Sequence, residues 1–170
     1  MPTVLLRLAS LNDVPILRAW DKKQHVIDSS GTDDHADWPA EINFDPPWRE
    51  ILIAETDHTP IGALVIIDPE FEISRYWGNI RSGFRAIDIW IGEEDHLGKG
   101  YGTAMMRLAI QRCFWSSDVD TILINPLATN TRAIAFYKKM KFEAEGHRTF
   151  GKDACFVLRL ERTTWRQSEA

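Results

Sequence analysis

The 170-residue sequence is poor in the features that mark several large classes of protein. It has two cysteines, Cys113 and Cys155, which lie far apart and outside any CxxC motif. Its longest apolar runs, such as residues 63–67, are far shorter than the roughly 20 residues of a membrane-spanning helix. The five histidines show no metal-ligand spacing. We therefore expect a cytoplasmic protein with reduced thiols, no metal site and no membrane partner.

The sequence also lacks any run of basic residues, and its formal net charge is −5. Binders of nucleic acid normally carry a basic patch, so this class of partner is not expected. An acidic protein with a pocket suits a small cationic partner better. The length and the 44% of hydrophobic residues are typical of one globular domain. We expect a single domain over residues 1–162, followed by a polar tail at residues 163–170.

The spacing of apolar residues predicts strands and helices in a mixed order. The predicted strands cover residues 3–9, 50–55, 60–67, 84–91, 121–124, 143–150 and 154–161. The predicted helices cover residues 11–20, 101–115 and 129–140, with a short helix near residue 40 inside the irregular stretch 28–48. This order indicates an α/β protein in which helices cover both faces of one mixed sheet.

A glycine-rich loop between a predicted strand and a predicted helix is the most specific signal. The segment reads Leu97-Gly98-Lys99-Gly100-Tyr101-Gly102-Thr103. Glycines let the backbone approach a phosphate closely, and the free N–H groups and dipole of a helix start attract the anion. The alternative is a tight turn without a ligand. A Walker loop would need Gly-Lys-Ser or Gly-Lys-Thr, and a dinucleotide fingerprint would need a different context.

This loop and the residues after it resemble the GNAT superfamily of N-acetyltransferases. In the family's loop motif, Gln or Arg is followed by two residues, a Gly, one residue, and a Gly or Ala. Gly100 and Gly102 match the glycines, whereas Leu97 replaces the polar residue and so removes one contact to the pyrophosphate. The downstream residues that resemble the family are Asn125-Pro126, Asn130-Thr131-Arg132-Ala133-Ile134, Tyr137 and Lys141-Phe142.

The resemblance implies a GNAT fold, an α+β arrangement whose mixed sheet has about seven strands flanked by about four helices. The sheet would splay between its fourth and fifth strands, and acetyl-CoA would bind there as acyl donor, with no metal. The cofactor-binding residues that the resemblance implies are Ile89, Trp90, Ile91, Leu97, Gly98, Lys99, Gly100, Tyr101, Gly102, Thr103, Asn130, Ala133 and Tyr137.

Within the superfamily the chain is most similar to aminoglycoside 6′-N-acetyltransferases. Segments with counterparts there include Trp20 with His25-Val26, Trp77, Ala86-Ile87-Asp88, the loop and the C-terminal hairpin. Two departures lie where the acceptor sugar would bind. Asn125-Pro126 replaces an Asp-Pro, and Asp28-Ser29-Ser30 replaces tryptophans. The acceptor-binding residues that the resemblance implies are His25, Trp77, Asp88 and Asn125.

Two residues are candidates for proton transfer. Asp88 is an acid within an apolar strand, which is costly unless the carboxylate is used or paired. It could take the proton of the acceptor amine, or it could be a solvent-facing strand residue. A phenol keeps its proton at neutral pH, because its ordinary pKa is about 10. The resemblance makes Tyr137 the acid that protonates the departing thiolate, and the alternative is a core aromatic residue.

The sequence as a whole predicts transfer of an acetyl group from acetyl-CoA to a primary amine. The expected acceptor is the 6′-amine of an aminoglycoside, which would attack directly in a ternary complex. The same loop would also serve an enzyme for a polyamine, a protein amine or a siderophore-type hydroxylamine. A non-catalytic acyl-CoA sensor is a third reading. The protein would be a monomer or a homodimer.

Overall fold

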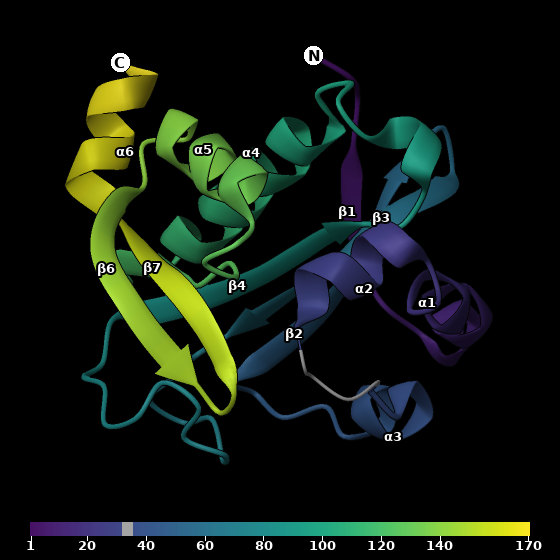
Figure 1. Ribbon diagram of the computed structural model, residues 1–170, viewed down its shortest axis with the longest axis horizontal. Helices are drawn as coiled ribbons and strands as arrows, with labels where there is room; N and C mark the ends of the chain where they lie inside the picture. Colours follow the sequence, from purple (N-terminus) through teal and green to yellow (C-terminus); the bar gives the residue numbers. More distant parts are fainter. Residues whose placement is uncertain (32–35) are drawn as a thin grey trace.

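The computed structural model describes residues 1–31 and 36–170 and is built on one seven-stranded sheet (Figure 1). The strand order is β1-β2-β3-β4-β5-β7-β6. The strands are β1 (Leu5–Leu8), β2 (Arg49–Thr56), β3 (Thr59–Ile67), β4 (Phe84–Ile91), β5 (Thr121–Ile124), β6 (Glu143–Phe150) and β7 (Asp153–Glu161). The predicted strands all correspond to observed ones, because strand-forming apolar residues alternate with turn residues along these segments.

Six α-helices are present in the described part of the chain, two more than expected. They are α1 (Val14–Trp20), α2 (Gln24–Ser30), α3 (Trp38–Asn43), α4 (Tyr101–Trp115), α5 (Thr131–Lys139) and α6 (Arg162–Glu169). Short 3₁₀ helices, η1 (Leu11–Asp13) and η2 (Glu94–His96), precede α1 and the glycine-rich loop. Part of the irregular stretch 28–48, residues 32–35, lies outside the described residues. None of the helices described is long and apolar enough to cross a membrane.

The sheet opens between β4 and β5, the parallel strand pair in an otherwise antiparallel sheet. These strands pair only from Phe84 with Thr121 to Ala86 with Leu123. Residues 87–91 remain paired with β3, whereas their pairing with β5 has ended. The mixed sheet and its splay confirm the predicted fold class. The separation of β4 from β5 leaves backbone groups of β4 available to a ligand.

Helices cover both faces of the sheet, and they divide the core into separate clusters. On one face, α4, α5 and α6 bury Met105, Ile110 and Tyr137 together with residues of the central strands. On the other face, α1 and α3 pack Trp20 and Trp38 against β2 and β3. The long loop of residues 68–83 covers the rest of that second face through a further apolar cluster. Figure 1 shows α1–α3 gathered at one end of the sheet and the β6–β7 hairpin at the other.

One glycine explains how the first helix is held beside β4. A methyl group on Gly92 would lie 2.1 Å from the ring of Trp20, which is fully buried. The indole N–H of Trp20 also donates to the carboxylate of Glu93 at 2.7 Å. Only a residue without a side chain can stand at position 92 while this ring stays in place.

The last residues, expected as a polar tail, form the helix α6 that folds back on the core. Trp165 is buried against it, and Arg107 stacks on its ring at 5.3 Å. The Arg162 side chain donates to the carbonyl oxygens of Phe114 and Val119, at 2.7 Å and 2.8 Å, where α4 ends. The polar composition of this segment therefore gave no sign of a helix, which is held in place by Arg162 and Trp165.

Candidate active site

A cavity of about 560 Å³ lies at the splay between β4 and β5. Its walls come from β4, the end of β5, the start of α5, the second half of α2 and the β6–β7 hairpin. The lining residues used below are Asp21, Trp38, Tyr76, Asp88, Ile89, Trp90, Asn125, Asn130, Ala133, Tyr137 and Asp153. The cavity therefore joins residues from both halves of the chain.

The cavity brings the two proton-transfer candidates together. Asp88 is exposed and shares its face of β4 with Trp90, and Tyr137 comes from α5 on the opposite side of the sheet, buried to 9% exposure. Burial raises the pKa of the Tyr137 phenol well above its ordinary value, and the negative charge of Asp88 raises this pKa further. Tyr137 therefore keeps its proton at neutral pH and can act as a donor.

The backbone N–H and C=O groups of β4 point alternately toward β3 and toward the splay, so only every second residue can offer them to a ligand. The Gly92 N–H donates to the Ile61 carbonyl at 2.9 Å. Hydrogen-bond directions alternate along an antiparallel strand, so the backbone of Trp90 also faces β3. Ile89 and Ile91 then direct their backbone groups toward the opening. Trp90 was predicted to contribute backbone contacts with its two neighbours, but its backbone pairs with Ala63 of β3, although the residue does line the cavity.

Two of the predicted acceptor residues do not line the cavity. His25 Nε2 lies 2.8 Å from the Ile91 carbonyl oxygen, a contact that fastens α2 to the end of β4. Trp77 is buried at 7% exposure, edge-on to Phe150 with ring centroids 5.0 Å apart. The two side chains therefore support elements that form the cavity wall and do not line the cavity themselves.

Tyr76, the residue before Trp77, lies at the cavity instead of Trp77. Tyr76 lines the cavity and stacks on Phe150 with ring centroids 4.7 Å apart. The Asn125 amide donates to the Tyr76 hydroxyl at 2.9 Å, so both residues form one neutral, polar wall. Sequence reasoning missed Tyr76, because an aromatic pair in a loop does not reveal which ring turns inward.

The glycine-rich loop has the geometry of an anion site at the start of α4. Gly98 and Gly100 have φ values of 71° and 87°, in the left-handed region that favours glycine. The first intrahelical bond is from the Ala104 N–H to the Gly100 carbonyl at 3.1 Å. The N–H groups of the first helical turn before Ala104 have no acceptor within the helix. They are thus available to phosphate oxygens.

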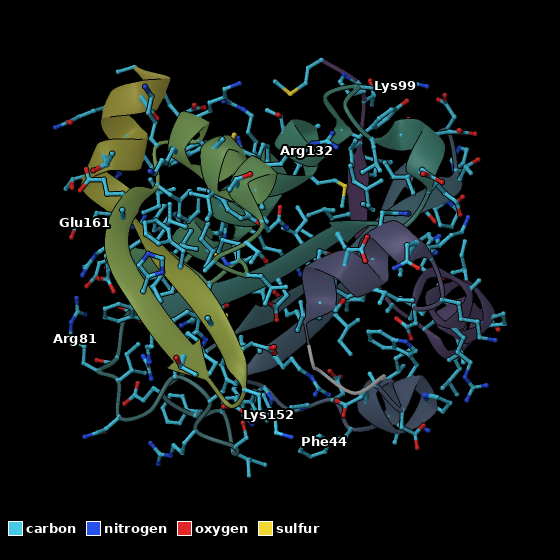
Figure 2. All side chains as sticks on the ribbon, in the orientation of Figure 1. Phe44, Arg81, Lys99, Arg132, Lys152 and Glu161 are labelled. Atoms are coloured by element: carbon cyan, nitrogen blue, oxygen red, sulfur yellow. The ribbon has the colours of Figure 1, made fainter. Side chains whose placement is uncertain are left out.

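Arg132 brings a second positive charge to this loop, in addition to that of Lys99. The Arg132 guanidinium lies 3.6 Å from the point that a methyl group on Gly98 would occupy. Figure 2 shows Arg132 and Lys99 at the same end of the molecule, at the starts of α5 and α4. Arg132 was part of the family-like segment but was not chosen as a site residue, because its separation from the loop in sequence hid the contact.

Asn130 shapes the start of α5 at the cavity wall. Its side-chain oxygen accepts the Ala133 N–H at 3.1 Å, which caps the helix. Among the residues that the structure describes, the amide nitrogen of Asn130 has no hydrogen-bond acceptor, so it could donate to a ligand. Ala133 lines the cavity one turn further along α5. No cluster of three or more metal-ligating side chains occurs in the part of the chain described.

Comparison with known proteins decides the family. The domain model described as "Acetyltransferase (GNAT) domain" matches residues 10–150, which include most of the sheet, the loop and α5. The chain belongs to the GNAT acetyltransferase family. As a member of this family the protein is an acetyl-CoA-dependent N-acetyltransferase, and the fold and the loop geometry agree with that activity.

Several relatives of this GNAT protein have known names. The chain is 27% identical over 154 residues to aminoglycoside N(6′)-acetyltransferase type 1 of Klebsiella pneumoniae, covering 85% of this chain and 76% of that protein. It is 36% identical over 76 residues to the kanamycin resistance protein of Rhizobium radiobacter, covering 44% and 70% respectively. The crystal structure of aminoglycoside acetyltransferase AAC(6′)-Ib with coenzyme A and kanamycin has a TM-score of 0.87 and 25% identity, covering 99% of this chain and 100% of that one.

Proposed function

We propose that this protein acetylates the 6′-amine of an aminoglycoside, with acetyl-CoA as the acetyl donor. The observation that carries the proposal is the cavity at the splay, which presents Asp88 and Tyr137 to one space. Support also comes from a relative named as an aminoglycoside N(6′)-acetyltransferase, which aligns over most of the chain. A structural relative, 25% identical, was crystallised with coenzyme A and kanamycin.

Acetyl-CoA would lie along the splay with its pyrophosphate on the glycine-rich loop. The N–H groups of residues 98–103 and the charges of Lys99 and Arg132 would hold the phosphates. The backbone of Ile89 and the amide of Asn130 would bond to the pantetheine arm, beside Ala133. Leu97 offers no polar side chain to the phosphates, so the backbone would carry more of the binding there.

Proton transfer would run across the sheet during direct attack in a ternary complex. Asp88 attracts the acceptor ammonium and takes its proton, directly or through a water, and the neutral nitrogen then forms a bond to the thioester carbon. Backbone N–H groups of β4 stabilise the oxygen as it gains negative charge. As the carbon–sulfur bond breaks, Tyr137 donates its proton to the thiolate, and its raised pKa keeps that proton available until this step. The nitrogen, positively charged after the attack, loses its second proton, which returns through water to the Tyr137 phenolate, and Asp88 releases the first proton to solvent.

The acceptor side of the cavity favours a small cationic molecule. Three carboxylates line the cavity, those of Asp21, Asp88 and Asp153. Asn125 supplies a neutral amide where the most similar family members have an acid, so this wall would hold a hydroxyl rather than an ammonium. We place the reaction in the cytoplasm, where acetyl-CoA is made, and expect a monomer or a homodimer as the working unit.

Release of free thiol from acetyl-CoA tests the proposal. Kanamycin, spermidine, a lysine-containing peptide and a hydroxylamine would each be added at equal concentration. Thiol release with kanamycin at least about tenfold faster than with the other amines is expected, because kanamycin holds several ammonium groups on rigid rings, whereas the flexible spermidine chain would lose more conformational entropy on meeting the three carboxylates. Faster turnover of spermidine or of the peptide would show that a polyamine or a protein amine, and not an aminoglycoside, is the acceptor. A protein that binds acetyl-CoA and releases no thiol with any amine would be a sensor.

A further inference from the structure

A second acidic and aromatic group lies in the same cavity, beyond Asp88. Asp21 ends α1, Trp38 begins α3, and Trp90 lies in β4, and all three line the cavity. These residues are here named the Asp21 subsite, and two of the three come from helices α1 and α3, which do not form part of the glycine-rich loop. The proton transfers assigned to Asp88 and Tyr137 leave this group without a role.

Packing holds the Asp21 carboxylate in a defined place. The Trp38 indole N–H donates to the carboxylate of Asp21 at 2.6 Å. Trp38 is buried to 6% exposure, and its ring lies 6.1 Å from that of Trp90, tilted by 35°. A carboxylate on a helix end is thereby fixed beside two indole rings, so little side-chain entropy remains to be lost when a cation binds.

The chemistry of these groups selects a cation. A carboxylate attracts an ammonium by charge, and indole faces attract it through their electron-rich rings. The Trp90 indole nitrogen is buried and has no hydrogen-bond partner among the described residues. Trp90 therefore lines the cavity without offering its N–H to a ligand. Hydroxyl groups would gain less here, because no indole donor is exposed to them.

Register along β4 gives the spacing between Asp88 and Trp90, the ring that lies beside Trp38 in the Asp21 subsite. Asp88 and Trp90 are two residues apart on the same face of the strand. Successive residues on one face lie about 7 Å apart, since a strand rises about 3.3 Å per residue. An acceptor that reaches both Asp88 and the Asp21 subsite must therefore carry its second amine at a separate position from the amine that is acetylated.

We propose that the Asp21 subsite binds a second ammonium group of the acceptor and so selects acceptors with at least two separated amines. This inference rests on the proposed function, because it assigns the acetylated amine to Asp88. A single-ring sugar with one primary amine would fill the Asp88 end and leave the subsite unoccupied. Trp38 acts as a positioning residue, since it holds the carboxylate through its indole N–H.

Calorimetric binding of kanamycin to the protein saturated with CoA tests the inference. Asp21→Asn removes the charge but keeps an oxygen that can accept the Trp38 N–H, so the fold and the CoA affinity should be unchanged. Asp118→Asn is the matched control, because Asp118 is an exposed acid in the turn after α4 that does not line the cavity. The second ligand is methyl 6-amino-6-deoxyglucoside, which has one ring and one amine.

The expected result is a kanamycin Kd about tenfold higher for Asp21→Asn, the usual scale for one charge-assisted contact, and under about twofold higher for Asp118→Asn. The affinity of the single-amine sugar should be equal in all three proteins. Equal kanamycin affinities of the two variants would overturn the inference, as would a parent protein that binds no kanamycin. Thiol release is measured separately. Kanamycin that binds through Asp21 without being acetylated would refute the proposed function and leave the subsite standing.

Discussion

At the scale of single residues, the proposed chemistry depends on a carboxylate and a phenol that share one cavity from opposite faces of the sheet. Asp88 was an acid in an apolar strand and Tyr137 an aromatic residue in a predicted helix, and the sequence left a structural role open for both. The shared cavity favours chemistry, because both residues line one space and because burial, followed by the negative charge of Asp88, raises the pKa of the Tyr137 phenol and keeps its proton in place. Their roles in catalysis stay predictions.

The first prediction concerns the carboxylate. Asp88→Asn keeps the size of the side chain and removes its charge, so kcat/KM for kanamycin at neutral pH should fall about 100-fold or more. The loss should shrink as the pH rises, because more of the amine is then already neutral. Rates of thiol release across the pH range measure this effect. Asp118→Asn, an exposed acid outside the cavity, is the control, and full activity of Asp88→Asn at neutral pH would make Asp88 a structural residue.

The second prediction concerns the phenol. Tyr137→Phe keeps the ring and removes the proton donor, so kcat should fall about 100-fold while CoA affinity stays the same. Burial and the Asp88 charge raise the pKa of Tyr137, so the phenol loses its proton only above its ordinary value of about 10. The parent enzyme should therefore show no alkaline fall in kcat below about pH 9. An alkaline fall in that range that disappears in Tyr137→Phe would contradict this assignment.

At the scale of elements, the junction of β4, the glycine-rich loop and α4 was the part most fully predicted. Its strand and helix were found at the predicted residues, because local pattern and turn chemistry agree there. Helices α2 and α6 were missed. Trp165 and Arg162 fix α6 through distant partners on α4, and a polar stretch read by itself does not reveal such contacts.

The third prediction tests the loop as the phosphate site. Gly102→Asp is preferred to a change at Gly100, whose positive φ would strain any side chain. A methyl group at position 102 meets Ile91 and Phe136 at 3.7 Å and 3.9 Å, so the variant should fold. Its carboxylate should weaken CoA binding at least about 100-fold by repulsion of the phosphates. Calorimetry with Gly102→Asn separates charge from size, and equal loss in both variants would argue against a phosphate at this place.

The fourth prediction tests the anchor of α6. Arg162→Ala leaves carbonyl oxygens at the end of α4 without their donor, so the free energy of unfolding should fall by about 2–3 kcal/mol. Urea unfolding measures the change, and Arg166→Ala, an exposed arginine on the same helix, is the control. Equal stability of the two variants would show that α6 is held by Trp165 alone.

At the scale of the whole molecule, sequence predicted the cofactor half of the cavity better than the acceptor half. The residues that face the cofactor are close together in sequence or follow a short motif, so local reasoning could assemble them. The acceptor wall combines α1, α3, the loop of residues 68–83 and the hairpin. Packing across the whole fold decides whether Tyr76 or Trp77 lines the cavity. It also brings Asp21 into contact with Trp38.

The most direct test of the whole account compares two acceptors that differ at one atom. Neomycin and paromomycin share their rings and differ in an amine or a hydroxyl on the 6′ carbon. With acetyl-CoA in excess, the account predicts rapid thiol release with neomycin and release at least about 100-fold slower with paromomycin, because Asp88 would no longer meet an amine. Equal rates with both acceptors would contradict the claim that this enzyme acetylates the 6′-amine.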